Sequence, residues 1–211
     1  MDDSYLIPYE EYGEDRFVEK RSKFIGRIWR VETPEEAVEK INQTRAMHRD
    51  ATHNCYAYII REGNYMRYSD DGEPQGTAGL PILDVLRREG ITNVCCVVTR
   101  YFGGILLGTG GLVRAYTQGA QVALAAAGVA KMSRYSVLLI SCPYSLFELV
   151  KTILPEHDAA IDEIDYGADV TITINMPVGG EETLSRALMD ATSGTVYAEP
   201  IEDKFMGRKI R

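Results

Sequence analysis

The sequence predicts an α+β protein built of two domains, the second of them ferredoxin-like. Two observations predict this class. In the last third of the chain, segments follow the order strand, helix, strand, strand, helix, strand, which is the split βαβ arrangement. In the first two thirds, helical segments alternate with β-like runs, and the apolar run 94–99 fits a strand buried on both faces. The 211 residues suffice for two hydrophobic cores, and we expect domains at 1–134 and 135–211.

The first domain begins with an extended, basic stretch over residues 16–31. A helix follows, because Thr33 is a favoured N-cap residue and Pro34 occupies the first turn. Aromatic and β-branched residues alternate on either side of a turn at 62–64, which predicts a hairpin of 54–61 and 65–69. The other elements expected here are a helix over 79–88 ended by Gly90, the strand 94–99 and a helix over 111–127.

The second domain shows clearer periodicity. An amphipathic helix over 144–154 is stopped by Pro155, and Gly167 supplies the turn between two central strands. A second helix opens at residue 179 and runs to about 191. The strands expected around these helices are 135–142, 159–166, 169–176 and 195–202.

The net charge of −8 is distributed unevenly. Residues 1–134 hold 17 Lys and Arg against 18 Asp and Glu, whereas residues 135–211 hold 6 against 13. The whole surface is therefore not a nonspecific nucleic-acid binder, and any polyanion site must be local. The acidic second domain suggests a docking or accessory role.

The chain lacks the signs of export or membrane insertion. Its first residues are acidic, without the basic flank and apolar stretch of a signal peptide, and its apolar runs are too short to span a bilayer. We therefore expect a cytoplasmic protein that does not act at a membrane. Its four cysteines, Cys55, Cys95, Cys96 and Cys142, form no CxxC motif and lie in β-like apolar runs, which predicts reduced, buried thiols.

The stretch TRYFGGILLGTGGLVRAY, residues 99–116, predicts a candidate anion site. A buried strand, a glycine-rich turn and a helix in succession place free backbone N–H groups beside Arg100 and Arg114. Those arginines face either a ligand phosphate or the acids of the nearby DDGEP stretch, Asp70, Asp71 and Glu73. The loop is neither a Walker A motif nor a dinucleotide-binding fingerprint, because the required residues do not follow the glycines.

Three other stretches have two interpretations each. In SDDGEPQGTAG, the acids lack the alternating oxygens of a calcium loop, so an ordered turn with Thr77 capping the next helix is favoured over a metal site. In HRDATHNCY, His53 and Cys55 share a strand face, but a buried histidine bonded to Asp70 or to backbone is favoured over a Cys-His hydrolase. The stretch RFVEKRSKFIGRIWR is either an edge strand, whose lysines and arginines prevent aggregation, or a surface that binds a phosphate backbone with aromatic stacking. The edge strand is slightly favoured.

The motifs DATHNCYAY, SDDGEPQGTAGLPILDVL and VVTRYFGGILLGTGGLVRAY, in this order, resemble the IMPACT/YigZ family over residues 16–130. The resemblance implies a first domain with the fold of the second domain of small-subunit ribosomal protein five. It also implies a second domain like those of elongation factor G, as in the bacterial YigZ branch, and a cytoplasmic protein linked to translation. Eukaryotic IMPACT proteins carry an extra RWD domain that this chain lacks, so their kinase-activator partner is not carried over.

The resemblance assigns no catalytic residue. We expect a non-enzymatic regulator that binds RNA or a translation component through a cleft holding Arg100 and Arg114, without metal or cofactor. The alternative is a small enzyme or sensor acting on a phosphorylated metabolite or nucleotide, with Asp70, Asp71 or Glu73 as base or metal ligand. The predicted ligand-binding residues are His53, Asn54, Asp70, Asp71, Gly72, Glu73, Thr77, Arg100, Tyr101, Phe102, Gly103, Gly104, Gly108, Gly111 and Arg114.

Overall fold

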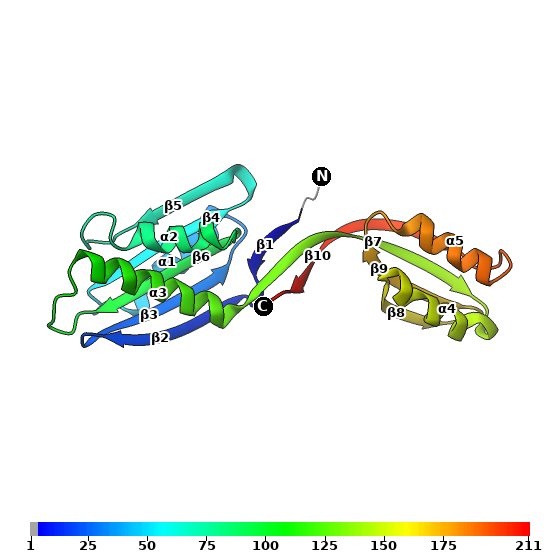
Figure 1. Cartoon of the computed structure of the whole chain (residues 1–211), viewed down its shortest axis with the longest axis horizontal. Helices are drawn as coiled ribbons and strands as arrows, with labels where there is room; N and C mark the ends of the chain where they lie inside the picture. The colour runs from blue at the N-terminus through cyan, green and yellow to red at the C-terminus, as the bar shows by residue number, and fades with distance from the viewer. Residues whose placement is uncertain (1–3) are drawn as a thin grey trace. The chain divides into compact units, whose positions relative to one another are not determined.

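The computed structural model describes residues 4–211, and the chain divides into two compact units (Figure 1). An N-terminal unit comprises residues 5–132 together with 207–211, and a C-terminal unit comprises 133–206. The last residues belong to the N-terminal unit because Val129 N–H donates to Arg211 O and Ile210 N–H donates to Val129 O, both at 2.9 Å. The sequence-based boundary at residue 134 did not anticipate this return of the chain.

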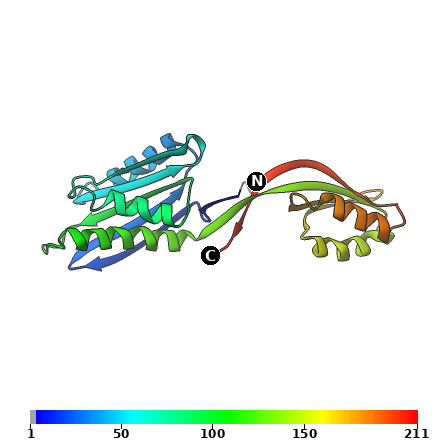
Figure 2. The same ribbon diagram turned by 45° about the horizontal axis from the view of Figure 1, so that its top comes forward.

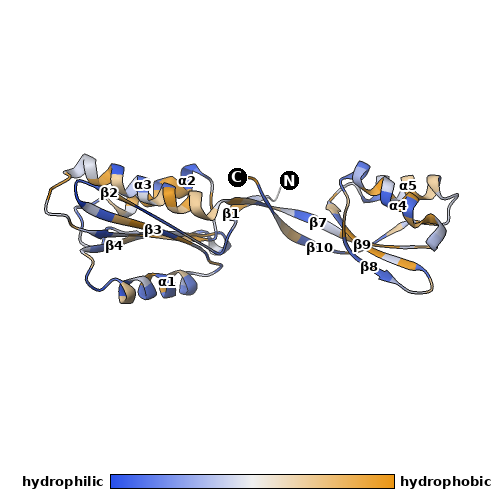
Figure 3. Cartoon of the chain, turned by 90° about the horizontal axis from the view of Figure 1, so that it is seen from below, coloured by the Kyte–Doolittle hydropathy of each residue, from blue (hydrophilic) through white to orange (hydrophobic). Residues whose placement is uncertain are grey.

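The N-terminal unit is a five-stranded antiparallel sheet covered on both faces. The strand order is β2-β3-β6-β4-β5. Figure 3 shows α1 on one face of this sheet and α2 with α3 on the other, and Figure 2 shows α2 beside α3. Its strands are β2 (Tyr12–Glu19), β3 (Ser22–Arg30), β4 (His53–Ile60), β5 (Tyr65–Ser69) and β6 (Val94–Tyr101), and the unit also contains β1 (Tyr5–Pro8), which is not part of this sheet. The helices are α1 (Pro34–Met47), α2 (Gly79–Arg88) and α3 (Thr109–Ala127).

The central strand β6 confirms the prediction of a strand buried on both faces. Its side chains alternate, because successive residues of a strand point to opposite faces. Cys96 and Val98 lie in the core under α2 and α3, whereas Cys95 and Val97 lie in the core under α1, and all four are fully buried. The same alternation places Arg100, two residues after Val98, on the face of α2 and α3.

Helix α3 packs unusually close to β2 and β3. A Cβ atom on Gly26 of β3 would lie 2.0 Å from the carbonyl oxygen of Gly119 in α3. A Cβ atom on Gly119 would in turn lie 2.7 Å from the side chain of Val98. Gly26 is therefore required by a contact with backbone, and Gly119 by a contact with the Val98 side chain.

Most helices and strands of the N-terminal unit lie where the sequence predicted them, including the β4–β5 hairpin, but two expectations for this unit were wrong. The basic stretch 16–31 is not one extended segment: it is the β2–β3 hairpin, turned by Lys20 and Arg21 with φ of 45° and 65°. Helix α3 begins at Thr109, two residues before the predicted start, because Gly108 with φ of 72° ends the loop.

The C-terminal unit confirms the ferredoxin-like class. Its elements follow the order βαββαβ, with β7 in the centre between β10 and β9, and β8 beside β9. Figure 3 shows α4 and α5 on one face of this sheet. The elements are β7 (Val129–Cys142), α4 (Phe147–Ile153), β8 (Ala160–Tyr166), β9 (Val170–Pro177), α5 (Glu181–Ala191) and β10 (Ala198–Lys209). The last strand thus ends later than the predicted 195–202, and β1 pairs with the first residues of β7.

All four cysteines are free and buried, as the sequence predicted. Burial raises the pKa of the Cys96 thiol to about 12 and that of Cys55 well above its usual range. Through residues 4–211, no helix combines the length and apolarity needed to cross a membrane.

Candidate functional site

The glycine loop joins the end of β6 to the start of α3. Gly103 is required by a close approach, because a Cβ atom there would lie 2.1 Å from the backbone of Arg21 in the β2–β3 turn. Gly104 and Gly108 adopt φ of 83° and 72°, which favours glycine. Gly111 lies in the first turn of α3 with Leu107 against it. The glycines therefore bring this loop onto the basic hairpin turn.

The DDGEP loop is ordered by Asp70. Its carboxylate accepts hydrogen bonds from the backbone N–H groups of Gly76, Ala78 and Gly79 at 2.8, 3.0 and 2.8 Å. These include the first donors of α2, so Asp70 caps this helix from a distance in sequence. The expectation that Thr77 caps α2 was wrong, because its hydroxyl donates to the Pro74 carbonyl at 2.6 Å.

Asp71 ties the same loop to β4 and α1. Its carboxylate accepts from Arg45 and from the Asn54 N–H, each at 2.7 Å. His53 Nδ1 lies 2.8 Å from the Asp71 carbonyl oxygen. Because a carbonyl only accepts, Nδ1 carries the proton and Nε2 faces the other way. The sequence predicted that His53 bonds either to the Asp70 carboxylate or to backbone, and the structure shows the backbone partner.

Arg100 and Glu73 form a buried ion pair, with Arg100 Nη1 2.6 Å from Glu73 Oε1 and side chains 6% and 3% exposed. The Tyr116 hydroxyl, also fully buried, donates to the same oxygen at 2.8 Å. The Arg100 guanidinium carbon lies 5.6 Å from the centre of the Phe24 ring and 5.4 Å from that of Phe102, and its Nε has no partner among the described residues. Of the two alternatives for Arg100, the structure shows pairing with the DDGEP loop.

Tyr116 was missed by the sequence analysis, although a signal existed. Tyr116 recurs at helical spacing with Leu112, Ala120 and Ala123, all buried in one core. A tyrosine on such a stripe needs a hydrogen-bond partner for its hydroxyl. Burial strongly raises the pKa of Tyr116, so the hydroxyl stays a donor to Glu73.

The two loops face each other across one pocket of about 450 Å³. Its lining combines the charged or polar side chains of His53, Glu73 and Arg100 with the apolar side chains of Phe102 and three leucines. The first residues of α3 also line it. The full lining is Thr52, His53, Gly72, Glu73, Pro74, Arg100, Phe102, Leu106, Leu107, Gly108, Thr109 and Leu112.

Several predicted residues lie outside this pocket. Tyr101 points to the α1 face, where its hydroxyl lies 2.7 Å from His48 Nδ1 and donates to Asp50 at 3.1 Å. Asn54 accepts from the buried Thr99 hydroxyl at 2.8 Å. Burial and the nearby Arg27 lower the pKa of His48, which disfavours its cationic form.

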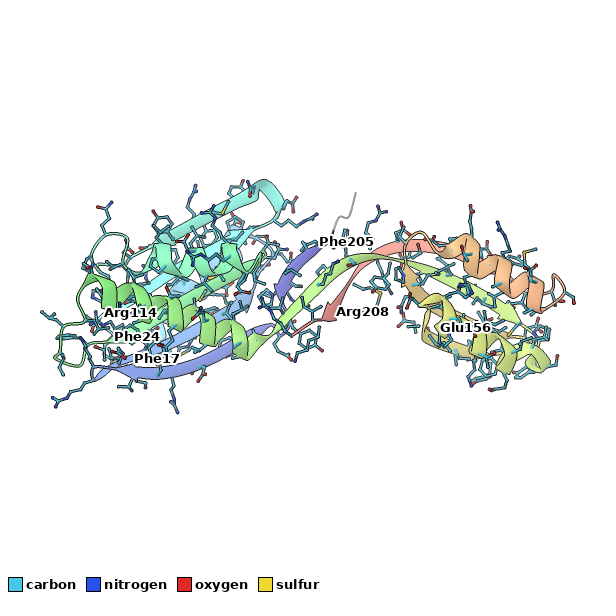
Figure 4. All side chains as sticks on the ribbon, viewed as in Figure 1. Phe17, Phe24, Arg114, Glu156, Phe205 and Arg208 are labelled. Carbon is cyan, nitrogen blue, oxygen red and sulfur yellow. The ribbon has the colours of Figure 1, made fainter. Side chains whose placement is uncertain are left out.

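Arg114 is not in the pocket with Arg100, so the predicted two-arginine cleft is wrong. Arg114 is exposed on α3, labelled in Figure 4, and lines a separate hollow with Glu19, Lys20 and Leu107. Arg114 and Tyr116 are two positions apart in a helix, which turns their side chains to nearly opposite sides. Tyr116 therefore enters the core, while Arg114 faces the β2–β3 turn.

Four basic residues near the glycine loop are called the basic rim here: Lys20, Arg21, Lys23 and Arg114. Lys20 and Arg114 line one hollow together with Glu19, and the Arg21 backbone meets Gly103. Lys23 lies on the α1 face, over the ring of its strand partner Tyr101. All four are exposed, and none forms an ion pair with another residue of the described part of the chain. Arg27, Arg30, Arg45 and Arg100 of the same unit do form such pairs. Phe102 is 46% exposed and Leu106 81% exposed beside this rim.

Comparisons with known proteins agree with this architecture. The Impact N-terminal domain model matches residues 20–124, and a domain of unknown function (DUF1949) matches 140–195. The IMPACT family member YvyE of Bacillus subtilis is 37% identical over 186 residues, covering 88% of this chain and 86% of YvyE. The chain belongs to the IMPACT family.

Other IMPACT family members extend the same match. YigZ of Escherichia coli is 34% identical, covering 87% of this chain and 92% of YigZ. A solved structure described as a hypothetical protein is 34% identical, covers 96% of this chain and 98% of its own, and superposes with a TM-score of 0.59. The Impact N-terminal match contains both loops of the pocket and the whole basic rim of this IMPACT family member.

Proposed function

We propose that this IMPACT family member is a non-enzymatic, translation-linked protein that binds single-stranded RNA along the basic rim. The observation that carries the proposal is the rim itself: four exposed cations without ion-pair partners in the described chain lie in the β2–β3 turn, at the start of β3 and on α3, near the glycine loop. The link to translation follows from the family resemblance.

The chemistry of the rim suits a phosphate backbone. Lysine and arginine side chains neutralise phosphates and release counterions, which gives RNA binding most of its affinity and its salt dependence. Exposed Phe102 supplies a surface on which an unpaired base can stack, and Lys23 lies 5.9 Å from the centre of the Tyr101 ring. The N-terminus of α3 has no side-chain cap, so its first N–H groups add to the positive potential.

Arg100 supports the rim indirectly. Its charge is already paired with Glu73 in the core, so it is a poor phosphate contact. Its guanidinium carbon instead lies 5.4 Å from the centre of the Phe102 ring, so Arg100 packs against that ring. Removing Arg100 would therefore disturb the loop rather than one RNA contact.

The second unit limits where RNA can bind. Residues 133–206 carry 13 acidic against 4 basic side chains, so their surface repels a polyanion. The alternative of a small enzyme is less favoured because Asp70, Asp71 and Glu73 each already accept hydrogen bonds that order the loop.

The test compares two triple variants of the full chain. The rim variant is Arg21→Asn, Lys23→Gln and Arg114→Gln, with asparagine chosen because it tolerates the positive φ of residue 21. The control is Arg67→Gln, Arg87→Gln and Arg88→Gln, which removes the same number of positive charges at positions outside the rim. Binding of a fluorescein-labelled single-stranded RNA of mixed sequence is measured by anisotropy between about 50 and 200 mM salt.

We expect the rim variant to bind RNA more weakly and to lose about 2 units of salt slope, since each phosphate contact on a single strand contributes about 0.7. The control should match the wild type. Equal binding by all three proteins would refute the rim as the site. An absence of RNA binding by the wild type would refute the function and direct attention to a protein partner.

A further inference from the structure

The pocket between the two loops offers hydrogen-bond acceptors that the protein itself leaves unused. Glu73 Oε1 accepts from both Arg100 and Tyr116. Glu73 Oε2 makes no hydrogen bond with the described residues, and His53 Nε2 lies 3.8 Å from it. One carboxylate oxygen is therefore held rigidly at the pocket wall and left available to a ligand.

His53 supplies the second acceptor. Its Nδ1 is committed as a donor to the Asp71 carbonyl, so in the neutral ring Nε2 carries a lone pair. Both His53 and Glu73 line the pocket. Two fixed acceptors 3.8 Å apart select a ligand edge with two adjacent N–H donors.

We propose that this pocket takes an unstacked guanine base, whose N1–H and N2–H groups donate to Glu73 Oε2 and His53 Nε2. The proposal rests on the RNA-binding function above and names the base that the site reads. Guanine is the base that fits, because its Watson–Crick edge presents two donors side by side. Adenine presents an acceptor, N1, beside its amino group, and that nitrogen would face the carboxylate.

The remaining walls suit a purine nucleotide. Phe102, Leu107 and Leu112 provide apolar surface for the flat faces of the base, and a volume of about 450 Å³ is in the range of small-ligand pockets. The residues at the start of α3, Gly108 and Thr109, line the same pocket. The ribose phosphate can thus lie toward backbone N–H groups and the basic rim.

The first test uses mononucleotides on the unmodified full chain, which avoids any question of folding. Isothermal titration at pH 8 compares 5′-GMP with inosine 5′-monophosphate, which lacks only the 2-amino group, and with AMP. We expect GMP to bind, inosine monophosphate to bind about tenfold or more weakly because one hydrogen bond is lost, and AMP to bind weakest. Equal affinities for GMP and AMP would overturn the proposal.

The second test removes one pocket wall. Phe102→Ala should reduce GMP affinity about tenfold or more, whereas the control Ile105→Ala, an exposed apolar residue of the same loop outside the pocket lining, should not. If the wild type binds RNA with the rim-dependent salt slope but shows no GMP binding, the guanine pocket is wrong and the RNA rim stands. If GMP binds but RNA does not, the pocket stands as a nucleotide site and the RNA function fails.

Discussion

Substitution of Glu73 tests whether the buried pair holds the two loops together. Glu73→Gln keeps the shape of the side chain but removes its charge, leaving the Arg100 guanidinium in a site where its side chain is 6% exposed. Removing one partner of a buried ion pair costs about 3–5 kcal/mol, because the other charge stays desolvated. The Tyr116 hydroxyl also loses its carboxylate acceptor, so we expect the upper part of that range.

The assay is urea unfolding followed by tryptophan fluorescence. Trp29 is the single tryptophan and lies in β3, so the signal reports the N-terminal unit alone. With a urea slope of about 2 kcal/mol/M, a loss of about 4–5 kcal/mol lowers the unfolding midpoint by about 2–2.5 M. The control is Glu62→Gln, an exposed carboxylate, which should shift the free energy of unfolding by less than about 0.5 kcal/mol.

Arg100→Met and the double variant complete a thermodynamic cycle. Arg100→Met removes the guanidinium charge that Glu73→Gln leaves unpaired. The double variant should therefore lose clearly less free energy of unfolding than the sum of the losses in the two single variants. A Glu73→Gln loss below about 1 kcal/mol, or additive single effects, would refute the claim that this pair fixes the pocket.

Three further predictions follow from the packing and protonation of this unit. Gly26→Ala should lower the free energy of unfolding by about 1–3 kcal/mol, because its Cβ would meet Gly119 backbone; unchanged stability in urea would contradict the close crossing. Asp70→Asn should cost about 1–2 kcal/mol and increase amide hydrogen exchange at the start of α2, since the charged acceptor of three N–H groups is lost. The pKa of His48 is lowered by burial and by Arg27, so its contribution to stability is present above the ordinary value of 6.5 and is lost as pH falls through the folded pKa. His48→Gln should flatten the stability profile below pH 6.5, and an unchanged profile would exclude that role.

Local patterns predicted much of the fold. The alternation in β6 placed a strand between two layers, and the βαββαβ order identified the ferredoxin-like unit. The motifs around the glycine and DDGEP loops also located both walls of the pocket. These features could be predicted because backbone propensity and the period of burial depend on neighbouring residues.

The identity of contacting side chains could not be predicted in the same way. The sequence offered Asp70, Asp71 and Glu73 as equal partners for Arg100, and only the packed loop shows that Glu73 is the one. It missed the Lys20–Arg21 turn, because both residues adopt positive φ without glycine and depend on the β2–β3 register. It also placed Arg114 with Arg100, although the rotation of α3 separates them.

The sequence by itself therefore determined the order of helices and strands, the buried centre of the sheet and the stretches from which the site is built. The tertiary structure alone decided which charged side chains form ion pairs in the core and which stay unpaired and exposed to a ligand. The physical reason is that ion pairing in a low-dielectric interior depends on distances of a few ångströms. Those distances are set by strand register and helix rotation, to which distant segments of the chain contribute.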